Sequence, residues 1–224
     1  ENLIKNNFGS HGTIIHAQEF FNNQILRICG QKSDKKTKLL LDEKILFEYK
    51  FYPQLAFVIP TFENGEIIQI LTTETKIYVY KLNSNNQNEE KIIDCTYGLI
   101  SKLKAFLNDF GDVVVFAQTE KGVATFRIIP STFSIDPIKL QFPDLKLFDA
   151  SNRDGDLIVV AGAKEDGSVW LGRCFDEYCN KIRMIQRKSF QTEKIEFIGV
   201  SLNHNDKPTV SLSKGDITQI INCK

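Results

Sequence analysis

The sequence predicts an all-β protein in which one four-stranded antiparallel unit recurs five times. Three observations predict this fold: strands rich in β-branched residues, turns marked by Gly, Asn or Asp, and the return of this pattern at a nearly constant spacing. The first strands of the five copies are expected at residues 3, 55, 103, 147 and 197, which are 52, 48, 44 and 50 residues apart. No segment keeps a 3.6-residue apolar period, so a long helix is not expected.

The first two strands of the unit are most alike in copies one and three. Residues 3–9 are expected to form an apolar strand and a turn marked by Asn and Gly, and the β-branched stretch Thr13–Gln18 follows. Residues 103–111 and Val113–Gln118 repeat that order, as do copies two, four and five at 55–71, 147–161 and 197–212. A continuous apolar run such as Val113–Phe116 is typical of a strand covered on both faces.

The rest of the unit is a second turn followed by two more strands. The third strand alternates apolar and polar residues, as in Lys76–Tyr80 and Ser168–Gly172, which indicates one covered and one wetter face. A shorter fourth strand is expected in four copies, at 38–41, 91–93, 137–140 and 181–185. The fifth copy reaches Cys223–Lys224 without a fourth strand, so that strand is either missing or supplied from elsewhere, such as further sequence or a partner chain.

The length of the repeat is typical of a β-propeller blade. We expect a single propeller domain over residues 1–224, with five blades of four antiparallel strands at about 3–46, 55–94, 103–141, 147–187 and 196–224. A two-sheet β-sandwich built from the same hairpins is the alternative fold. The shared turn positions and strand character of the five copies favour the propeller.

The composition excludes several classes of protein. Hydrophobic residues make up 42% of the chain and charged residues 25%, which is typical of a folded domain and not of a disordered polyelectrolyte. Lys and Arg number 28, as do Asp and Glu, so the sequence lacks the basic excess expected of a nucleic-acid-binding protein. The sequence also contains no apolar run near the roughly 18–20 residues of a membrane span, and no cofactor motif such as a glycine-rich phosphate loop.

The five cysteines bear on two questions: whether the protein folds in an oxidising compartment, and which cysteines form disulfides. Cys174 and Cys179 flank the expected turn from third to fourth strand in copy four, where a hairpin brings two Cα atoms within the roughly 4.4–6.8 Å of a disulfide. Cys29 and Cys223 are expected at equivalent ends of third strands and can pair, although Cys29 can also pair with Cys95. A second Cys/His pair with zinc-ligand spacing is missing, so no metal site is expected. An intracellular protein with reduced, buried thiols is the alternative.

Copy four carries the one family resemblance. The stretch Asp154–Val160, followed by Gly167–Cys174 and Cys179, resembles the repeats of secreted propellers of the sialidase-like or tachylectin-like type. In such repeats an Asp-Gly turn, an apolar strand, a second Gly-led strand and a Cys-x4-Cys pair recur in this order. The resemblance implies a ring of five to seven blades and a secreted or cell-surface location.

Catalysis by such a propeller would need carboxylates around a central axis. The candidates are four acidic residues in turns and one in a first strand: Glu63, Asp109, Asp154, Asp206 and Asp149. Acidic residues in tight turns usually form local hydrogen bonds, whereas Asp149 interrupts an inner strand and is the more unusual carboxylate. The three-arginine clamp and the Asp box of sialidases are not found, and none of the histidines, His11, His16 and His204, accompanies a recognisable nucleophile. The sequence therefore leans away from an enzyme.

Three aromatic residues are candidates for a binding surface. Trp170, Tyr78 and Phe126 are expected at similar places in the third strands of their copies. They can form a platform on which a sugar stacks, or they can pack in the core between blades.

These observations together favour a non-catalytic extracellular binding or adhesion propeller that recognises a protein or glycan partner. The five copies differ in their turns, which favours a protein surface over a lectin with five equal sites. One alternative is a five-bladed glycoside hydrolase with axial carboxylates, and another is an intracellular scaffold propeller.

Overall fold

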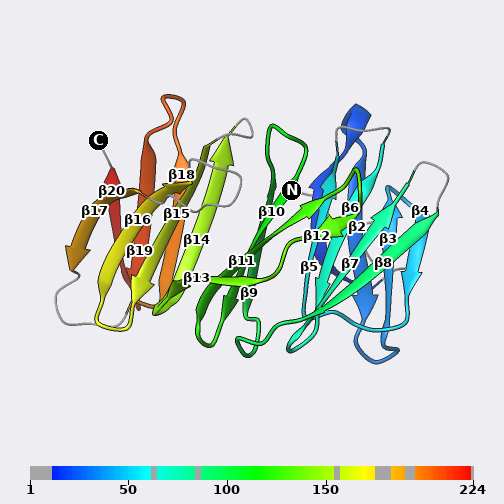
Figure 1. The fold of residues 1–224 in the computed structure, drawn as a ribbon, viewed down its shortest axis with the longest axis horizontal. Coiled ribbons are helices and arrows are strands. Elements are labelled where there is room, and N and C mark those ends of the chain that lie inside the picture. The colour runs from blue at the N-terminus through cyan, green and yellow to red at the C-terminus, as the bar shows by residue number, and fades with distance from the viewer. Residues whose placement is uncertain are drawn as a thin grey trace. The chain divides into compact units, whose positions relative to one another are not determined.

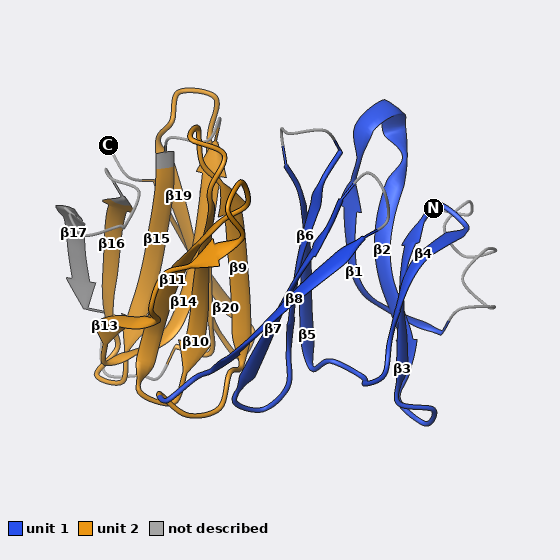
Figure 2. Cartoon of the chain, turned by 45° about the vertical axis from the view of Figure 1, so that its right-hand side comes forward, with its two compact units in different colours: residues 1–96 blue, residues 97–224 orange. Residues whose placement is uncertain are grey.

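A computed structural model describes residues 12–61, 65–83, 87–153, 157–174, 183–189 and 195–222. Within them the chain forms five antiparallel sheets, which confirms the prediction of an all-β fold. The chain divides into two compact units, residues 1–96 and residues 97–224 (Figure 2). No helix in the described part of the chain is long and apolar enough to cross a membrane.

The first unit contains two four-stranded sheets (Figure 1). In each sheet, strands that follow one another in the chain are neighbours. The strands of the first sheet are β1 (Thr13–Glu19), β2 (Ile25–Gln31), β3 (Lys36–Leu41) and β4 (Lys44–Tyr49). The strands of the second sheet are β5 (Leu55–Pro60), β6 (Ile67–Thr72), β7 (Lys76–Leu82) and β8 (Asn88–Asp94). One 3-10 turn, Phe21–Asn23, joins β1 to β2.

The second unit contains three sheets. The first consists of β9 (Lys102–Leu107), β10 (Val113–Thr119) and β11 (Gly122–Ile129), with β12 (Ser134–Ile135) and β13 (Lys139–Pro143) both paired to β11. The next consists of β14 (Leu145–Arg153), β15 (Leu157–Lys164), β16 (Ser168–Cys174) and β17 (Arg183–Ser189). The last has three described strands, β18 (Phe197–Leu202), β19 (Pro208–Lys214) and β20 (Ile217–Asn222).

The first sheet is shifted by one strand from its predicted assignment. The stretch Thr13–Gln18 forms the first strand of the sheet and not the second, and it packs against β5 as β14 packs against β18. The predicted fourth strand, 38–41, is the third, and β4 completes the sheet. Cys29 consequently lies on a second strand, so its predicted place at the end of a third strand is wrong. The predicted strand at residues 3–8 lies outside the described residues.

Apolar side chains are buried between neighbouring sheets of each unit. In the first unit, Leu26 and Leu39 of one sheet pack with Val58 and Leu71 of the other. In the second unit, every residue of β10 is buried, which confirms that this apolar strand is covered on both faces. The second sheet of this unit, β14–β17, buries Phe148 on the side of β9–β13 and Val159 on the side of β18–β20.

Candidate functional site

A β-bulge shapes the outer strand β13 beside the candidate site. Phe142 pairs with Val123 of β11 and Leu140 pairs with the next residue, Ala124, so Gln141 is one extra residue on β13 between these two pairs. An extra residue of this kind bends its strand and re-aims side chains, and bulges are frequent beside binding sites. Asp144 then turns the chain with a φ of 74° into β14.

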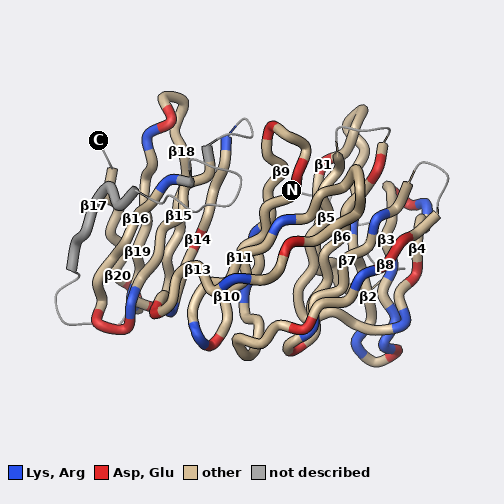
Figure 3. The backbone as a smooth tube through the Cα atoms, in the orientation of Figure 1, with Lys and Arg blue, Asp and Glu red and all other residues tan. Residues whose placement is uncertain are grey.

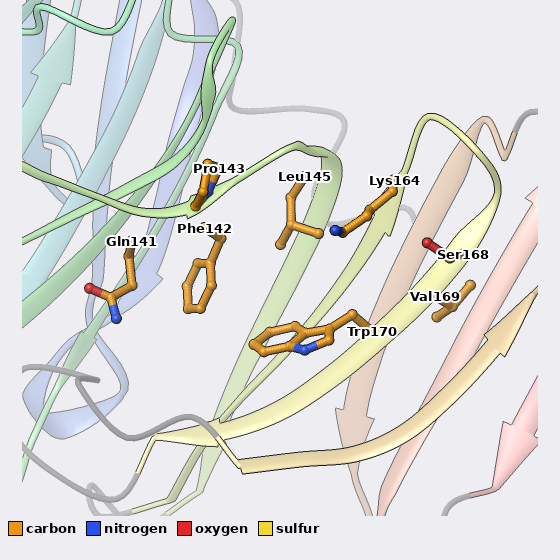
Figure 4. Close-up of a pocket in the computed structure, with 8 residues that line it drawn as sticks. All are labelled: Gln141, Phe142, Pro143, Leu145, Lys164, Ser168, Val169 and Trp170. Atoms are coloured by element: carbon orange, nitrogen blue, oxygen red, sulfur yellow. The ribbon is translucent and has the colours of Figure 1, made fainter.

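A cavity of about 280 Å³ opens between β13 and the β15–β16 hairpin (Figure 4). The rings of Phe142 and Trp170 meet there, with centroids 5.1 Å apart and planes tilted by 52°. Leu145 lies directly over Gly162, because a Cβ at Gly162 would stand 2.5 Å from the Leu145 Cδ1. The glycine therefore makes room for the leucine beside the indole.

The polar groups at this cavity come from three residues, Gln141, Lys164 and Ser168. The Ser168 hydroxyl donates to Asp166 Oδ1 at 2.6 Å. Lys164 forms a loose ion pair with the exposed Asp144, at 4.0 Å. None of the described residues that line the cavity carries a carboxylate or an imidazole, so the site is suited to binding and not to acid–base catalysis by a carboxylate pair.

Two other cavities occupy a comparable place in the repeat. One, of about 720 Å³, is lined by Tyr52 and the β6–β7 turn, and the other, of about 430 Å³, by Glu165 and Glu196. Each of the three lies where a link between consecutive sheets passes beside a hairpin between second and third strands. Their linings differ: aromatic rings line the cavity beside Trp170, whereas mainly polar or charged residues line the other two.

The structure separates the three aromatic residues predicted as a platform. Trp170 is half-buried and lines the aromatic cavity. Tyr78 packs on Phe51 with ring centroids 4.5 Å apart, in the core of the first unit. Phe126 is only 4% exposed and lies on the opposite face of β11 from Val123, the residue that pairs with Phe142. Trp170 is thus the one member of this set beside a cavity in the described residues.

Asp149 joins three inner strands and is buried. Its Oδ1 accepts from Lys102 Nζ and Lys104 Nζ of β9, each at 3.0 Å, and its Oδ2 accepts from the Val200 N–H of β18 at 3.0 Å. Burial raises the pKa of Asp149, but the Val200 N–H and the two ammonium groups outweigh it and hold the pKa below its ordinary value. This network accounts structurally for an acidic residue in an inner strand.

The other predicted catalytic candidates are not gathered with Asp149. Asp206 pairs with Arg153 at 3.3 Å on the surface, and Glu63 and Asp154 lie outside the described residues. His16 stacks on Phe57, where burial lowers the pKa of the imidazole. In the residues that the structure describes, no cluster of His, Cys, Asp and Glu could hold a metal ion.

The cysteine predictions fall largely outside the described part of the chain. Cys29 is a buried thiol without a disulfide, and burial raises its pKa. Cys95 is buried as well. Cys29 therefore forms a disulfide with neither of its predicted partners, Cys95 and Cys223. Cys179 and the side chain of Cys174 lie outside the described residues, so their pair stays a prediction.

The outer edge of the last sheet is the second candidate site. β20 is mostly exposed, with Ile217 at 67% and Ile220 at 66%, and no described strand pairs with its far side. The outer strands β4, β8 and β13 carry charged residues, for example Glu89 and Lys91 in β8, whereas β20 carries none (Figure 3). Charged residues protect strand edges from pairing with other chains, and β20 lacks this protection.

Comparisons with known proteins support the fold. No family model matches the sequence, and no curated protein is significantly similar to it. Among solved structures, the chain resembles a catalytically inactive virginiamycin B lyase from Staphylococcus aureus with quinupristin, with a TM-score of 0.56 and 12% identity over 97% of this chain and 71% of that one. It also resembles BBS1N in complex with ARL6DN, with a TM-score of 0.49 and 11% identity over 95% of this chain and 78% of that one.

These similar structures are propeller-like proteins. At 12% identity, the similarity to the lyase shows the fold alone. The chain therefore has a propeller-like all-β fold made of several antiparallel sheets.

Proposed function

We propose that this chain is a non-catalytic propeller that binds a partner protein, and that the partner adds a strand to β20. The observation that carries the proposal is the uncharged, exposed strand β20, in a fold whose outer strands β4, β8 and β13 are charged. An exposed edge binds an extended segment through main-chain hydrogen bonds, while alternate side chains give specificity.

The chemistry of the edge defines the partner segment. Ile217 and Ile221 lie on the face of β20 that continues the core shared with β14–β17, and Ile221 already belongs to that core. Ile220 lies on the opposite face. A complementary strand is therefore uncharged and carries apolar side chains at alternate positions on both faces.

The proposal extends to the architecture and the location of the protein. The five sheets would be the blades of one five-bladed propeller, with the partner strand as the fourth strand of the last blade. The different linings of the three cavities favour a protein over a repeated glycan ligand. We also propose a secreted or cell-surface location, supported by the resemblance of copy four to secreted repeats and by the Cys174-x4-Cys179 spacing.

The test compares capture of a partner by three forms of the full chain: wild type, Ile220→Lys and Ile92→Lys. Ile92 is a matched control, because it is 55% exposed on the outer strand β8. A partner retained by wild type and by Ile92→Lys, but lost with Ile220→Lys, supports the proposal. Hydrogen exchange of the β20 amides should also slow when the partner binds.

Two results would overturn the proposal. Equal capture by all three forms would show that the partner binds elsewhere. Slow exchange of the β20 amides in the protein alone would show that the edge is already covered, and the mass of the particle in solution would tell whether a second copy covers it. The proposed location is tested by alkylation without prior reduction. If the protein contains two disulfides, one of its five cysteines should be alkylated, whereas alkylation of all five would contradict secretion.

A further inference from the structure

We propose that the cavity between Phe142 and Trp170 is a second binding site, which takes an apolar side chain that lies beside a carboxylate, as at the C-terminus of a peptide. The residues of this site come from β13, β14 and the β15–β16 hairpin, and none comes from β20. Either site can therefore exist without the other.

The size and lining of the cavity fit one apolar side chain. Phe142 and Leu145 are almost completely buried, and the half-buried indole of Trp170 closes the lower side in Figure 4. The volume of about 280 Å³ lies just under the roughly 300–1,000 Å³ of sites for drug-sized ligands. A single aromatic or branched side chain matches this space better than an oligosaccharide does.

The charge at the cavity favours an anion. Lys164 carries the one charged group among the described residues that line the cavity, and none of them is acidic. Gln141 adds an amide that can donate as well as accept, and the Ser168 hydroxyl donates to Asp166. A carboxylate can accept from the Lys164 ammonium and from the Gln141 amide, whereas a neutral sugar gains no ion pair here.

Lys164 is available for such an anion. Figure 4 shows its side chain directed toward the space between Leu145 and Trp170. Its ion pair with Asp144 is 4.0 Å long, and the two side chains are 42% and 75% exposed. Exposed pairs of this length contribute little, so a ligand carboxylate can displace Asp144 at small cost.

The single tryptophan of the chain gives a direct readout of binding. N-acetylphenylalanine and its amide differ only in the carboxylate, and both can be titrated while the emission of Trp170 is followed. We expect saturable binding of the acid, at least roughly tenfold tighter than binding of the amide, because a charged hydrogen bond is lost with the amide.

Substitution of Lys164 tests the partner of the carboxylate. Lys164→Met should remove the preference for the acid, and Lys164→Arg should keep it. Lys146→Met is the matched control, because Lys146 lines the neighbouring cavity and not this one. Thermal unfolding of each variant should stay cooperative, so that a loss of binding is not a loss of fold.

Three outcomes would overturn the inference. Equal affinity for the acid and the amide would show that the cavity binds an apolar side chain without recognising a carboxylate. Binding of methyl galactoside without binding of the acid would assign the cavity to a glycan. If no probe changes the Trp170 emission, the cavity is not a binding site for any of these ligands. None of these results bears on the β20 edge, which the capture experiment tests separately.

Discussion

The two faces of the sheet β14–β17 form interfaces of opposite character. The face toward β9–β13 is aromatic: Phe116, Phe142, Phe148 and Trp170 meet there. The face toward β18–β20 is aliphatic, built from residues such as Val159 and Leu212. A cavity lies at the rim of each interface, lined by aromatic rings on the first side and mainly by charged residues on the second. Asp149 ties both interfaces, because it pairs with two lysines of β9 and accepts a hydrogen bond from an N–H of β18. The two faces of one sheet thus differ in the side chains that fill them, and so in the ligands that the cavities beside them suit.

The largest effect is expected from the aromatic interface. Phe116→Ala removes a fully buried ring that packs on Phe106 and Phe148, and it should lower the free energy of unfolding by about 3–5 kcal/mol. Urea denaturation measures this loss. A loss below about 1 kcal/mol would mean that this ring is not central to the interface.

The strands β9, β14 and β18 should respond to loss of the carboxylate that joins them. Asp149→Ala leaves the Val200 N–H and two ammonium groups without their acceptor, and it should cost about 2–3 kcal/mol at neutral pH, less than a fully buried pair because both lysines are partly exposed. Asp149→Asn keeps an oxygen for Val200 and should cost less. Equal costs for the two variants in urea denaturation would show that the hydrogen bond from Val200 contributes nothing, and no cost for Asp149→Asn would show that the charge contributes nothing.

The same carboxylate should make the stability depend on pH. The folded pKa of Asp149 lies below its ordinary value of 3.8, so the charge adds stability above that value, and this stability is lost as the pH falls through the folded pKa. The difference in unfolding free energy between wild type and Asp149→Asn should therefore shrink in acid below about pH 4. A difference that stays constant from pH 7 to pH 3 would contradict this assignment.

The smallest effect is expected at the mouth of the cavity. Lys164→Met removes only a loose, exposed ion pair and should change the unfolding free energy by less than about 0.5 kcal/mol. Thermal unfolding measures the change. A larger destabilisation would show that Lys164 supports the fold and would weaken its assignment to ligand binding.

Much of the fold could be predicted from periodicity, because strands and turns of one repeat leave a local signal. The continuous apolar run of β10 and the alternation of β16 correspond to real strands. The strand assignment predicted for the first sheet is wrong by one strand for two reasons. Leu3, Ile4 and Phe8 resemble the apolar residues of a first strand, and Lys44 and Glu48 make β4 resemble a polar connection between strands. Sequence spacing alone cannot tell which of two neighbouring strands opens a sheet.

The candidate site could be predicted only in part. Trp170 was a candidate from its place in an alternating strand, but its partners Phe142 and Leu145 lie on other strands, and only packing of the sheets brings them together. The bulge at Gln141 leaves no sequence signal, since it depends on the register of β13 against β11. That the last sheet has only three described strands could be anticipated, because counting strands per copy needs no tertiary information.

The composition of β20 also has a consequence for the handling of this protein. Ile-Thr-Gln-Ile-Ile-Asn is a six-residue segment with β-branched side chains, no charge and no proline, which is the composition of segments that stack into fibrils. The chain has no net charge to keep its copies apart. A partner strand on this edge would therefore also protect the last sheet from aggregation, and the solubility of the protein should rise when that strand is bound.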